Sequence, residues 1–161
     1  MNALRESGLR PNRLELEITE TLLLSNTDAT MAILKKLKAI GVSIVMDDYS
    51  SLSYLWKFPF DKIKIDRSFM TAFEESDDGV ETVLKSIIDL GREMKMRVTV
   101  EGVETERQVD LLYNAHADQV QGFYFGEPLP ASELSADVLR DFRTSLGVDN
   151  RSKGETRRSS G

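Results

Sequence analysis

The sequence contains no cysteine, a single histidine and only four prolines among 161 residues. Without cysteine the chain has neither a disulfide nor a thiolate metal site, which fits a reducing compartment, and we expect a cytoplasmic location. It also lacks any run of about 18 apolar residues, so we expect no membrane-spanning helix. The first residues, MNALRE, contain no apolar stretch of the kind that a secretory signal needs.

Acidic residues modestly outnumber basic ones, and the formal net charge is −6. Neither DNA nor an anionic membrane attracts an acidic chain, so we expect neither as a partner. A bound metal ion could still bring a phosphate ligand to an acidic site. The apolar share of 40% and the charged share of 30% are ordinary for a globular domain with a sizeable core.

Strand-like and helix-like segments alternate along the chain. Period-two or β-branched runs predict strands at residues 14–18, 42–46, 61–66, 97–101 and 118–121. Three-residue and four-residue spacing of apolar residues predicts helices at 28–40, 52–57, 79–96 and 105–114, with a last helix after Pro130. This order favours an α/β fold of parallel strands joined by crossover helices. Residues 1–147 are expected to form the domain, and 148–161, which are polar, a disordered tail.

Each predicted strand has one apolar side and one largely polar side. The apolar set is Leu14, Leu16, Ile18, Val42, Ile44, Met46, Ile63, Ile65, Val98, Val100 and Val120. The polar set is Glu15, Glu17, Ser43, Asp47, Lys62, Lys64, Asp66, Thr99, Glu101, Gln119 and Gln121. Successive side chains of a strand point to opposite faces, so the apolar set can pack on the helices while the polar set lines an interior or crevice. The carboxyl ends of the strands are the usual ligand-binding end of such sheets.

One acidic residue at a strand end is more often a helix cap or a solvated charge. Five polar strand ends of matching parity are harder to attribute to capping. Burying several carboxylates without a cation is costly, and a divalent ion with oxygen ligands, such as Mg²⁺ or Mn²⁺, would offset the cost.

Four ordered segments resemble the EAL domain of cyclic di-GMP phosphodiesterases. They are LELEITE at 14–20, DDYSSLSYL at 47–55, FDKIKIDRSF at 60–69, and VEGVET at 100–105 leading to QVQGF at 119–123. The resemblance implies a modified TIM-type (β/α) barrel, of which this chain would hold all but the first strands. It also implies cleavage of cyclic di-GMP to pGpG with two divalent metal ions.

The resemblance assigns roles to nine residues. Metal binding is implied for Glu17, Asp47 and Asp48. Catalytic roles are implied for Lys64, which matches a lysine near the attacking water, and for Glu101, the acidic residue of the Glu-Gly-Val-Glu motif. Supporting or substrate-binding roles are implied for Glu20, Asp66, Glu104 and Gln121. Such roles suit the residue types, because two cations can generate hydroxide at neutral pH and stabilise charge on a phosphodiester.

Plainer interpretations stay open for several of these residues. Lys64 can simply neutralise neighbouring carboxylates, and Glu104 can cap the helix that follows it. Trp56, Phe58 and Phe60 are expected to pack in the core rather than to stack on a base.

Two departures from the family pattern bear on activity. The sequence contains no Glu-Ala-Leu or Glu-Val-Leu, the motif whose glutamate is a metal ligand in the family, and no asparagine ligand in an Asn-Leu-Ser context. In addition, Asp-Asp-Tyr-Ser-Ser at 47–51 stands where the family has Asp-Asp-Phe-Gly-Thr/Ala-Gly-Tyr-Ser-Ser, so four residues of the loop beside the metals are gone. We therefore expect Mg²⁺ or Mn²⁺ to bind weakly or not at all.

Three functions are compatible with this pattern. The first is a degenerate EAL-like domain, without turnover, that binds cyclic di-GMP or regulates a partner. The second is an active phosphodiesterase completed by ligands from another chain, and the third is a protein-interaction scaffold without nucleotide binding. An incomplete barrel leaves strand edges uncovered, so we expect a homo-oligomer or a partner protein on the open edge.

Overall fold

The computed structural model describes residues 2–19, 23, 27–47, 55–76 and 79–133. The chain divides into two units, Met1–Tyr124 and Phe125–Gly161, which are considered separately. In the second unit the described part includes a short 3₁₀ helix, η3 (Ala131–Glu133). It begins the helix predicted after Pro130, and the rest of that helix and the predicted tail lie outside the described residues.

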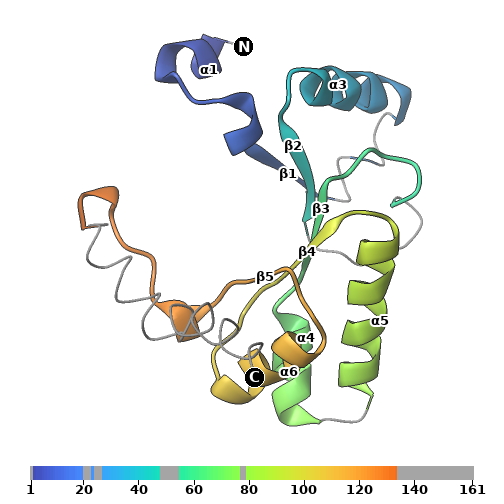
Figure 1. Cartoon of the computed structure of the whole chain (residues 1–161), viewed down its shortest axis with the longest axis vertical. Coiled ribbons are helices and arrows are strands. Elements are labelled where there is room, and N and C mark those ends of the chain that lie inside the picture. Colours follow the sequence, from blue (N-terminus) through green and yellow to red (C-terminus); the bar gives the residue numbers. More distant parts are fainter. Residues whose placement is uncertain (1, 20–22, 24–26, 48–54, 77–78, 134–161) are drawn as a thin grey trace, which may run out of the picture. The chain divides into compact units, whose positions relative to one another are not determined.

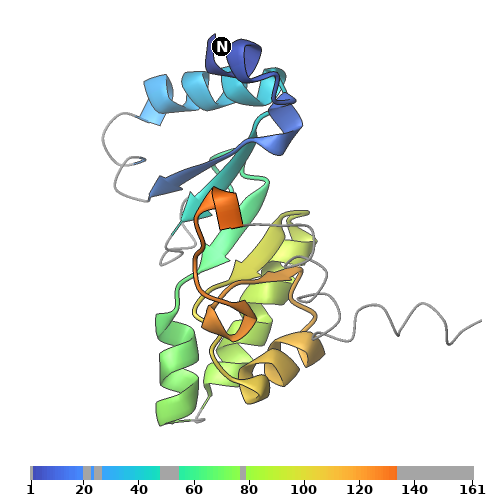
Figure 2. The same cartoon turned by 90° about the vertical axis from the view of Figure 1, so that its left-hand side faces the viewer.

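Five parallel strands in chain order form the sheet of the first unit. They are β1 (Glu15–Thr19), β2 (Ser43–Asp47), β3 (Lys62–Ile65), β4 (Arg97–Val100) and β5 (Gln119–Val120). Each strand pairs with the next one along the chain, and the strand arrows point the same way in Figure 2. The predicted α/β fold with parallel strands is confirmed.

Helices connect the strands as the sequence pattern predicts, with two additions. The predicted helices are α3 (Thr27–Ala39), α5 (Val80–Glu93) and α6 (Glu106–Asn114), and the additions are α1 (Asn2–Ser7) and α4 (Ser68–Glu75). Figure 1 shows α3 beside β2 and α5 beside β4, and these pairs of elements are in contact. Of the predicted helical turn at 52–57, only residues 55–57 are described, and they form a turn.

The apolar side of the sheet is the core, as predicted. Its fully buried members on the three central strands are Ile44, Met46, Ile63, Ile65, Val98 and Val100. Helix α5 lies directly on this side, because a Cβ added at Gly91 would collide with Cγ2 of Val98 and lie 3.5 Å from Cδ1 of Ile63. Gly91 therefore sets how closely α5 approaches β3 and β4.

The polar side chains of the strands share the opposite face. Strand register pairs Glu15 with Ser43, Lys64 with Thr99, and Thr99 with Gln119. Val45 interrupts this face, since it pairs with Glu17 and is fully buried. The sheet therefore carries a row of charged and amide groups on its non-helical side, with one apolar residue among them.

The aromatic residues before β3 divide into two groups. Phe58 and Phe60 are buried, as predicted, and their rings pack with centroids 6.1 Å apart. The same prediction is wrong for Trp56, which is 72% exposed and has the Lys57 ammonium 5.2 Å from its ring centroid. A turn at 55–57 directs this side chain away from the core.

Replacing Gly91 by alanine tests the close contact of α5 with the sheet. We expect Gly91→Ala to lower the free energy of unfolding by about 2 kcal/mol, because crowding against Val98 outweighs the roughly 1 kcal/mol gain in helix propensity. Ser86→Ala, at an exposed position of the same helix, is the control and should change it by less than about 0.5 kcal/mol. Urea unfolding of both variants measures the difference, and a stabilised Gly91→Ala protein would contradict the packing described.

Candidate functional site

Three carboxylates from three strands converge on one ammonium group. Nζ of Lys64 lies 2.7 Å from Oε1 of Glu101, 3.0 Å from Oδ1 of Asp47 and 3.1 Å from Oε1 of Glu17. Lys64 is on β3, Glu17 is on β1, Asp47 ends β2, and Glu101 follows β4. We call these four residues the Lys64 cluster.

The parallel sheet brings these residues together, with Glu17 two residues before the partner of Asp47 and Glu101 two residues after the partner of Lys64. Thr19 pairs with Asp47 across β1 and β2, and Lys64 pairs with Thr99 across β3 and β4. The backbone N–H of Glu101 donates a 3.0 Å hydrogen bond to the carbonyl of Ile65, so the ladder continues past the end of β4. The cluster therefore lies toward the carboxyl ends of the strands, where α/β sheets bind ligands.

Lys64 is nearly enclosed, with its side chain only 11% exposed. Burial acts to lower the pKa of Lys64, but hydrogen bonds with Glu101, Asp47 and Glu17 outweigh burial and hold the pKa well above its ordinary value. The side chain is consequently a cation at neutral pH and a hydrogen-bond donor. It cannot accept a proton from water in this arrangement.

A second ion-pair network lies beside the cluster on the same face. Nζ of Lys62 is 2.6 Å from Oε2 of Glu15, and the Arg97 guanidinium is 3.2 Å from the other oxygen of Glu15. Thr99 donates a 3.1 Å hydrogen bond to Oε1 of Gln119. The strand pattern placed Glu15 and Lys62 on the polar side, but nothing in the sequence indicated that they pair.

Members of both networks line one cavity of about 410 Å³. Its lining residues are Glu15, Glu17, Lys62, Lys64, Thr99, Gln119, Val120 and Gln121. Gln121, for which the resemblance implies a supporting role, thus lies in the same cavity as Glu17 and Lys64. Its backbone also links β4 to the loop that follows, because its N–H donates to Val100 and its carbonyl accepts from Val103.

The metal ions implied by the resemblance do not fit the described side chains as they are arranged. Carboxylate oxygens are the right donors for Mg²⁺ or Mn²⁺. However, the Lys64 ammonium lies within 3.1 Å of all three carboxylates of the cluster. Within the described ranges, no group of three or more carboxylate or imidazole side chains is placed to hold a metal ion. Asp48 and Glu20, two further predicted site residues, lie outside those ranges.

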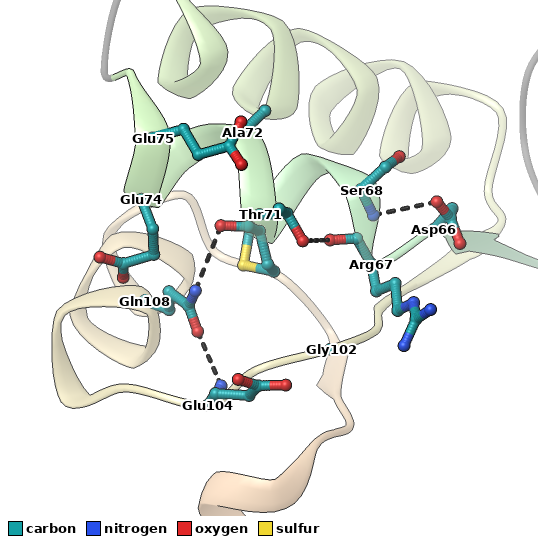
Figure 3. A pocket seen from close by; sticks show the side chains of 11 residues that line it. Asp66, Arg67, Ser68, Thr71, Ala72, Glu74, Glu75, Gly102, Glu104 and Gln108 are labelled. Atoms are coloured by element: carbon teal, nitrogen blue, oxygen red, sulfur yellow. Dashed lines mark hydrogen bonds between the residues drawn. The ribbon is translucent and has the colours of Figure 1, made fainter.

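Asp66 and Glu104 line a different pocket, of about 800 Å³, beside α4 (Figure 3). Oδ1 of Asp66 accepts a 2.9 Å hydrogen bond from the backbone N–H of Ser68, and the contacts with Ser68 hold the pKa of Asp66 below its ordinary value. The backbone N–H of Glu104 donates to Oε1 of the buried Gln108, whose amide donates to the carbonyl of Met70. These contacts organise the starts of α4 and α6.

The helix after Glu104 is capped by another residue. The Thr105 hydroxyl accepts from the backbone N–H of Gln108, and the Gln108 side chain accepts from the Thr105 N–H, which is a capping box. The alternative that Glu104 caps α6 with its own side chain is therefore wrong. The sequence Thr-Glu-Arg-Gln at 105–108 carries the signal that identifies Thr105 instead.

The family model of the EAL domain matches residues 1–128. The chain is 41% identical over 142 residues to the bifunctional diguanylate cyclase/cyclic di-GMP phosphodiesterase MucR of Pseudomonas aeruginosa, covering 85% of this chain and 20% of MucR. It is 40% identical over 146 residues to the cyclic di-GMP phosphodiesterase NbdA of the same species, covering 88% of this chain and 18% of NbdA. The chain belongs to the EAL domain family.

Solved structures show the same relationship. The structure of the MucR phosphodiesterase in complex with cyclic di-GMP matches with a TM-score of 0.75 and 39% identity, over 83% of this chain and 56% of that chain. The manganese and cyclic di-GMP complex of Klebsiella pneumoniae BlrP1 matches with a TM-score of 0.72 and 31% identity, over 79% and 33%. The sheet described above is thus part of a TIM-barrel-like EAL fold.

The chain is short beside these relatives. It spans 16% to 20% of the length of the first four curated proteins that it matches. None of the described helices is long and apolar enough to cross a membrane.

Proposed function

We propose that this chain is an EAL-like domain of cyclic di-GMP signalling that binds the nucleotide or regulates a partner without phosphodiesterase turnover. One observation carries the proposal: the sequence contains no Glu-Ala-Leu motif, whose glutamate is a metal ligand in the family by the resemblance. Other residues that match the family's reaction centre are present and lie together, namely Glu17, Asp47, Lys64 and Glu101. The chain therefore keeps several residues of the site but lacks the motif glutamate that the resemblance requires.

The chemistry of hydrolysis needs a nucleophile and a proton acceptor. By resemblance, two divalent ions would supply the attacking hydroxide in an active relative. In this chain Lys64 is protonated and occupies the centre of the carboxylates, so it donates hydrogen bonds and does not accept a proton.

Nucleotide binding has a different requirement. The Lys64 cluster has three carboxylates against one ammonium, which leaves two negative charges in excess and repels a phosphodiester anion. Thr99, Gln119 and Gln121 offer hydroxyl and amide groups in the same cavity that hydrogen-bond neutral edges of a ligand. Binding of cyclic di-GMP should therefore depend on these hydroxyl and amide groups rather than on the carboxylates of the Lys64 cluster.

Specific features favour two other functions. The first is a phosphodiesterase completed by metal ligands from a second chain, which is favoured by the presence of Glu17, Asp47 and Glu101 at the matching positions. A scaffold without nucleotide binding is favoured by the ion pairs beside the cavity, since Lys62 and Arg97 both already pair with Glu15.

Calorimetric titration with cyclic di-GMP, with and without Mg²⁺ or Mn²⁺, separates these functions when the same samples are assayed for pGpG. We expect binding of cyclic di-GMP without formation of pGpG. Product that disappears in Asp47→Ala would instead establish an active enzyme completed in trans. A folded sample that neither binds nor hydrolyses would leave the scaffold function.

We also propose that the chain associates through the open edge of its sheet. Among the described residues, β1 has a neighbouring strand only on its β2 side, so its other edge presents free backbone donors and acceptors. Size-exclusion chromatography with light scattering should give a dimer or a larger species. A monodisperse monomer that melts cooperatively would contradict this proposal.

A further inference from the structure

Gln108 is a polar side chain buried between helix α4 and the loop that follows β4. It is only 3% exposed. Its Oε1 accepts hydrogen bonds from the backbone N–H of Glu104 at 2.7 Å and of Thr105 at 3.1 Å. Its amide nitrogen donates a 3.2 Å hydrogen bond to the carbonyl of Met70 in α4. One side chain therefore ties the loop at residues 101–105 to α4 (Figure 3).

These contacts go beyond what the cap of α6 requires. A capping box needs only the reciprocal bonds between Thr105 and Gln108. The bonds to Glu104 and Met70 are additional, and the one to Met70 is fully buried. A buried amide that loses its partner is costly, because water cannot replace the bond. The loop and α4 are therefore held in one arrangement by the amide of Gln108.

The two segments joined by Gln108 both begin at the Lys64 cluster. Helix α4 follows β3, the strand that carries Lys64, and the loop at 101–105 opens with Glu101. The distance of 2.7 Å between Nζ of Lys64 and Oε1 of Glu101 is the shortest of the three ion pairs in the cluster. Gln108 thus connects the continuations of the two chain segments that meet in this contact.

The backbone of the loop can transmit a displacement of α4 to Glu101. The N–H of Glu101 donates to the carbonyl of Ile65, the last residue of β3. Gly102 has a positive φ of 73° and packs directly on Arg67, where an added Cβ would collide with the Arg67 side chain. The loop therefore follows the start of α4 closely, and little slack separates Gln108 from Glu101.

Thr105 joins the same two segments in a weaker way. Its hydroxyl donates a 2.9 Å hydrogen bond to Oε1 of Glu74 at the end of α4, but this bond is exposed and water can replace it. Substituting Thr105 would remove this bond and the side-chain cap of α6 while leaving the bonds of Gln108 to Glu104 and Met70 in place. Thr105→Ala is therefore a matched control for Gln108.

We propose that Gln108 is a positioning residue that sets Glu101 against Lys64 by holding the loop at 101–105 on α4. Gln108 acts through the backbone, since its own hydrogen bonds are made with Glu104, Thr105 and Met70. The proposal goes beyond the proposed function, because it concerns the geometry of two residues at the reaction-centre positions and requires neither nucleotide binding nor turnover.

The experiment uses the full 161-residue chain, isotope-labelled for NMR, and follows hydrogen exchange of the Lys64 and Lys62 ammonium groups. The two signals are assigned by their loss in Lys64→Met and Lys62→Met. In Gln108→Glu the loop N–H groups keep an acceptor, whereas the donor to Met70 is lost. We expect the Lys64 ammonium to exchange at least about threefold faster in this variant, because its contact with Glu101 loosens.

Lys62 is the internal reference. It lies on the same strand and is also buried, but it pairs with Glu15, which is outside the loop and α4. Its exchange rate should stay within about 1.5-fold in Gln108→Glu. Thr105→Ala should lower the melting temperature by about 4 °C through loss of the cap and should leave both ammonium rates unchanged.

Gln108→Met provides a second variant, with an uncharged side chain of similar size, if the charge of Gln108→Glu prevents folding. It removes the donor and the acceptor together, so Lys64 should exchange at least as fast as in Gln108→Glu. Three results would overturn the proposal: unchanged exchange of Lys64 in a folded Gln108 variant, equal acceleration of Lys62, or equal acceleration of Lys64 in Thr105→Ala.

These outcomes are distinct from those of the nucleotide experiments. The exchange measurements contain no cyclic di-GMP, so formation of pGpG by this chain would refute the proposed lack of turnover and leave the role of Gln108 untouched. Conversely, unchanged exchange of Lys64 would remove the positioning role without bearing on nucleotide binding.

Discussion

The contacts of Lys64 with Glu17, Asp47 and Glu101 connect β1, β2, β3 and the end of β4 on the face of the sheet that the helices do not cover. That face collects charged groups from adjacent parallel strands, and each of them is costly to bury alone. The helical side needs no such arrangement, because apolar side chains fill it. The stability of the polar face therefore depends on how its charges are paired, and Lys64 pairs the largest group.

The Lys64 cluster occupies positions that match the reaction centre of the family. The chain belongs to a family whose relatives are named as cyclic di-GMP phosphodiesterases and whose solved structures include a manganese complex with the nucleotide. In the described residues the positions that match the reaction centre hold three carboxylates and one ammonium group, so the cluster keeps an excess of negative charge. The proposed lack of turnover therefore rests on the missing Glu-Ala-Leu motif and not on the ion pairs of Lys64.

Much of the fold and part of the site could be predicted from the sequence. Alternation of apolar and polar residues predicted both faces of the sheet, since strand geometry alone fixes that period. It did not predict where Asp66 and Glu104 lie: β3 ends at Ile65, the chain turns into α4, and both residues line the pocket beside that helix. Helix α4 itself was missed because it is short, although the buried Met70 and Phe73 have helical spacing. Ion pairing across strands, as between Glu15 and Arg97, depends on register and distance, which no local pattern contains.

The most direct test of the central claim is the coupling free energy between Lys64 and Asp47, whose charged atoms lie 3.0 Å apart. A double-mutant cycle with Lys64→Met and Asp47→Asn, measured by urea unfolding in chelator, isolates this term. The account predicts that Asp47→Asn is less harmful, or even stabilising, once Lys64 is gone, with a coupling of about 2 kcal/mol. A coupling below about 0.5 kcal/mol would mean that the two substitutions act independently and that Lys64 does not hold the cluster together.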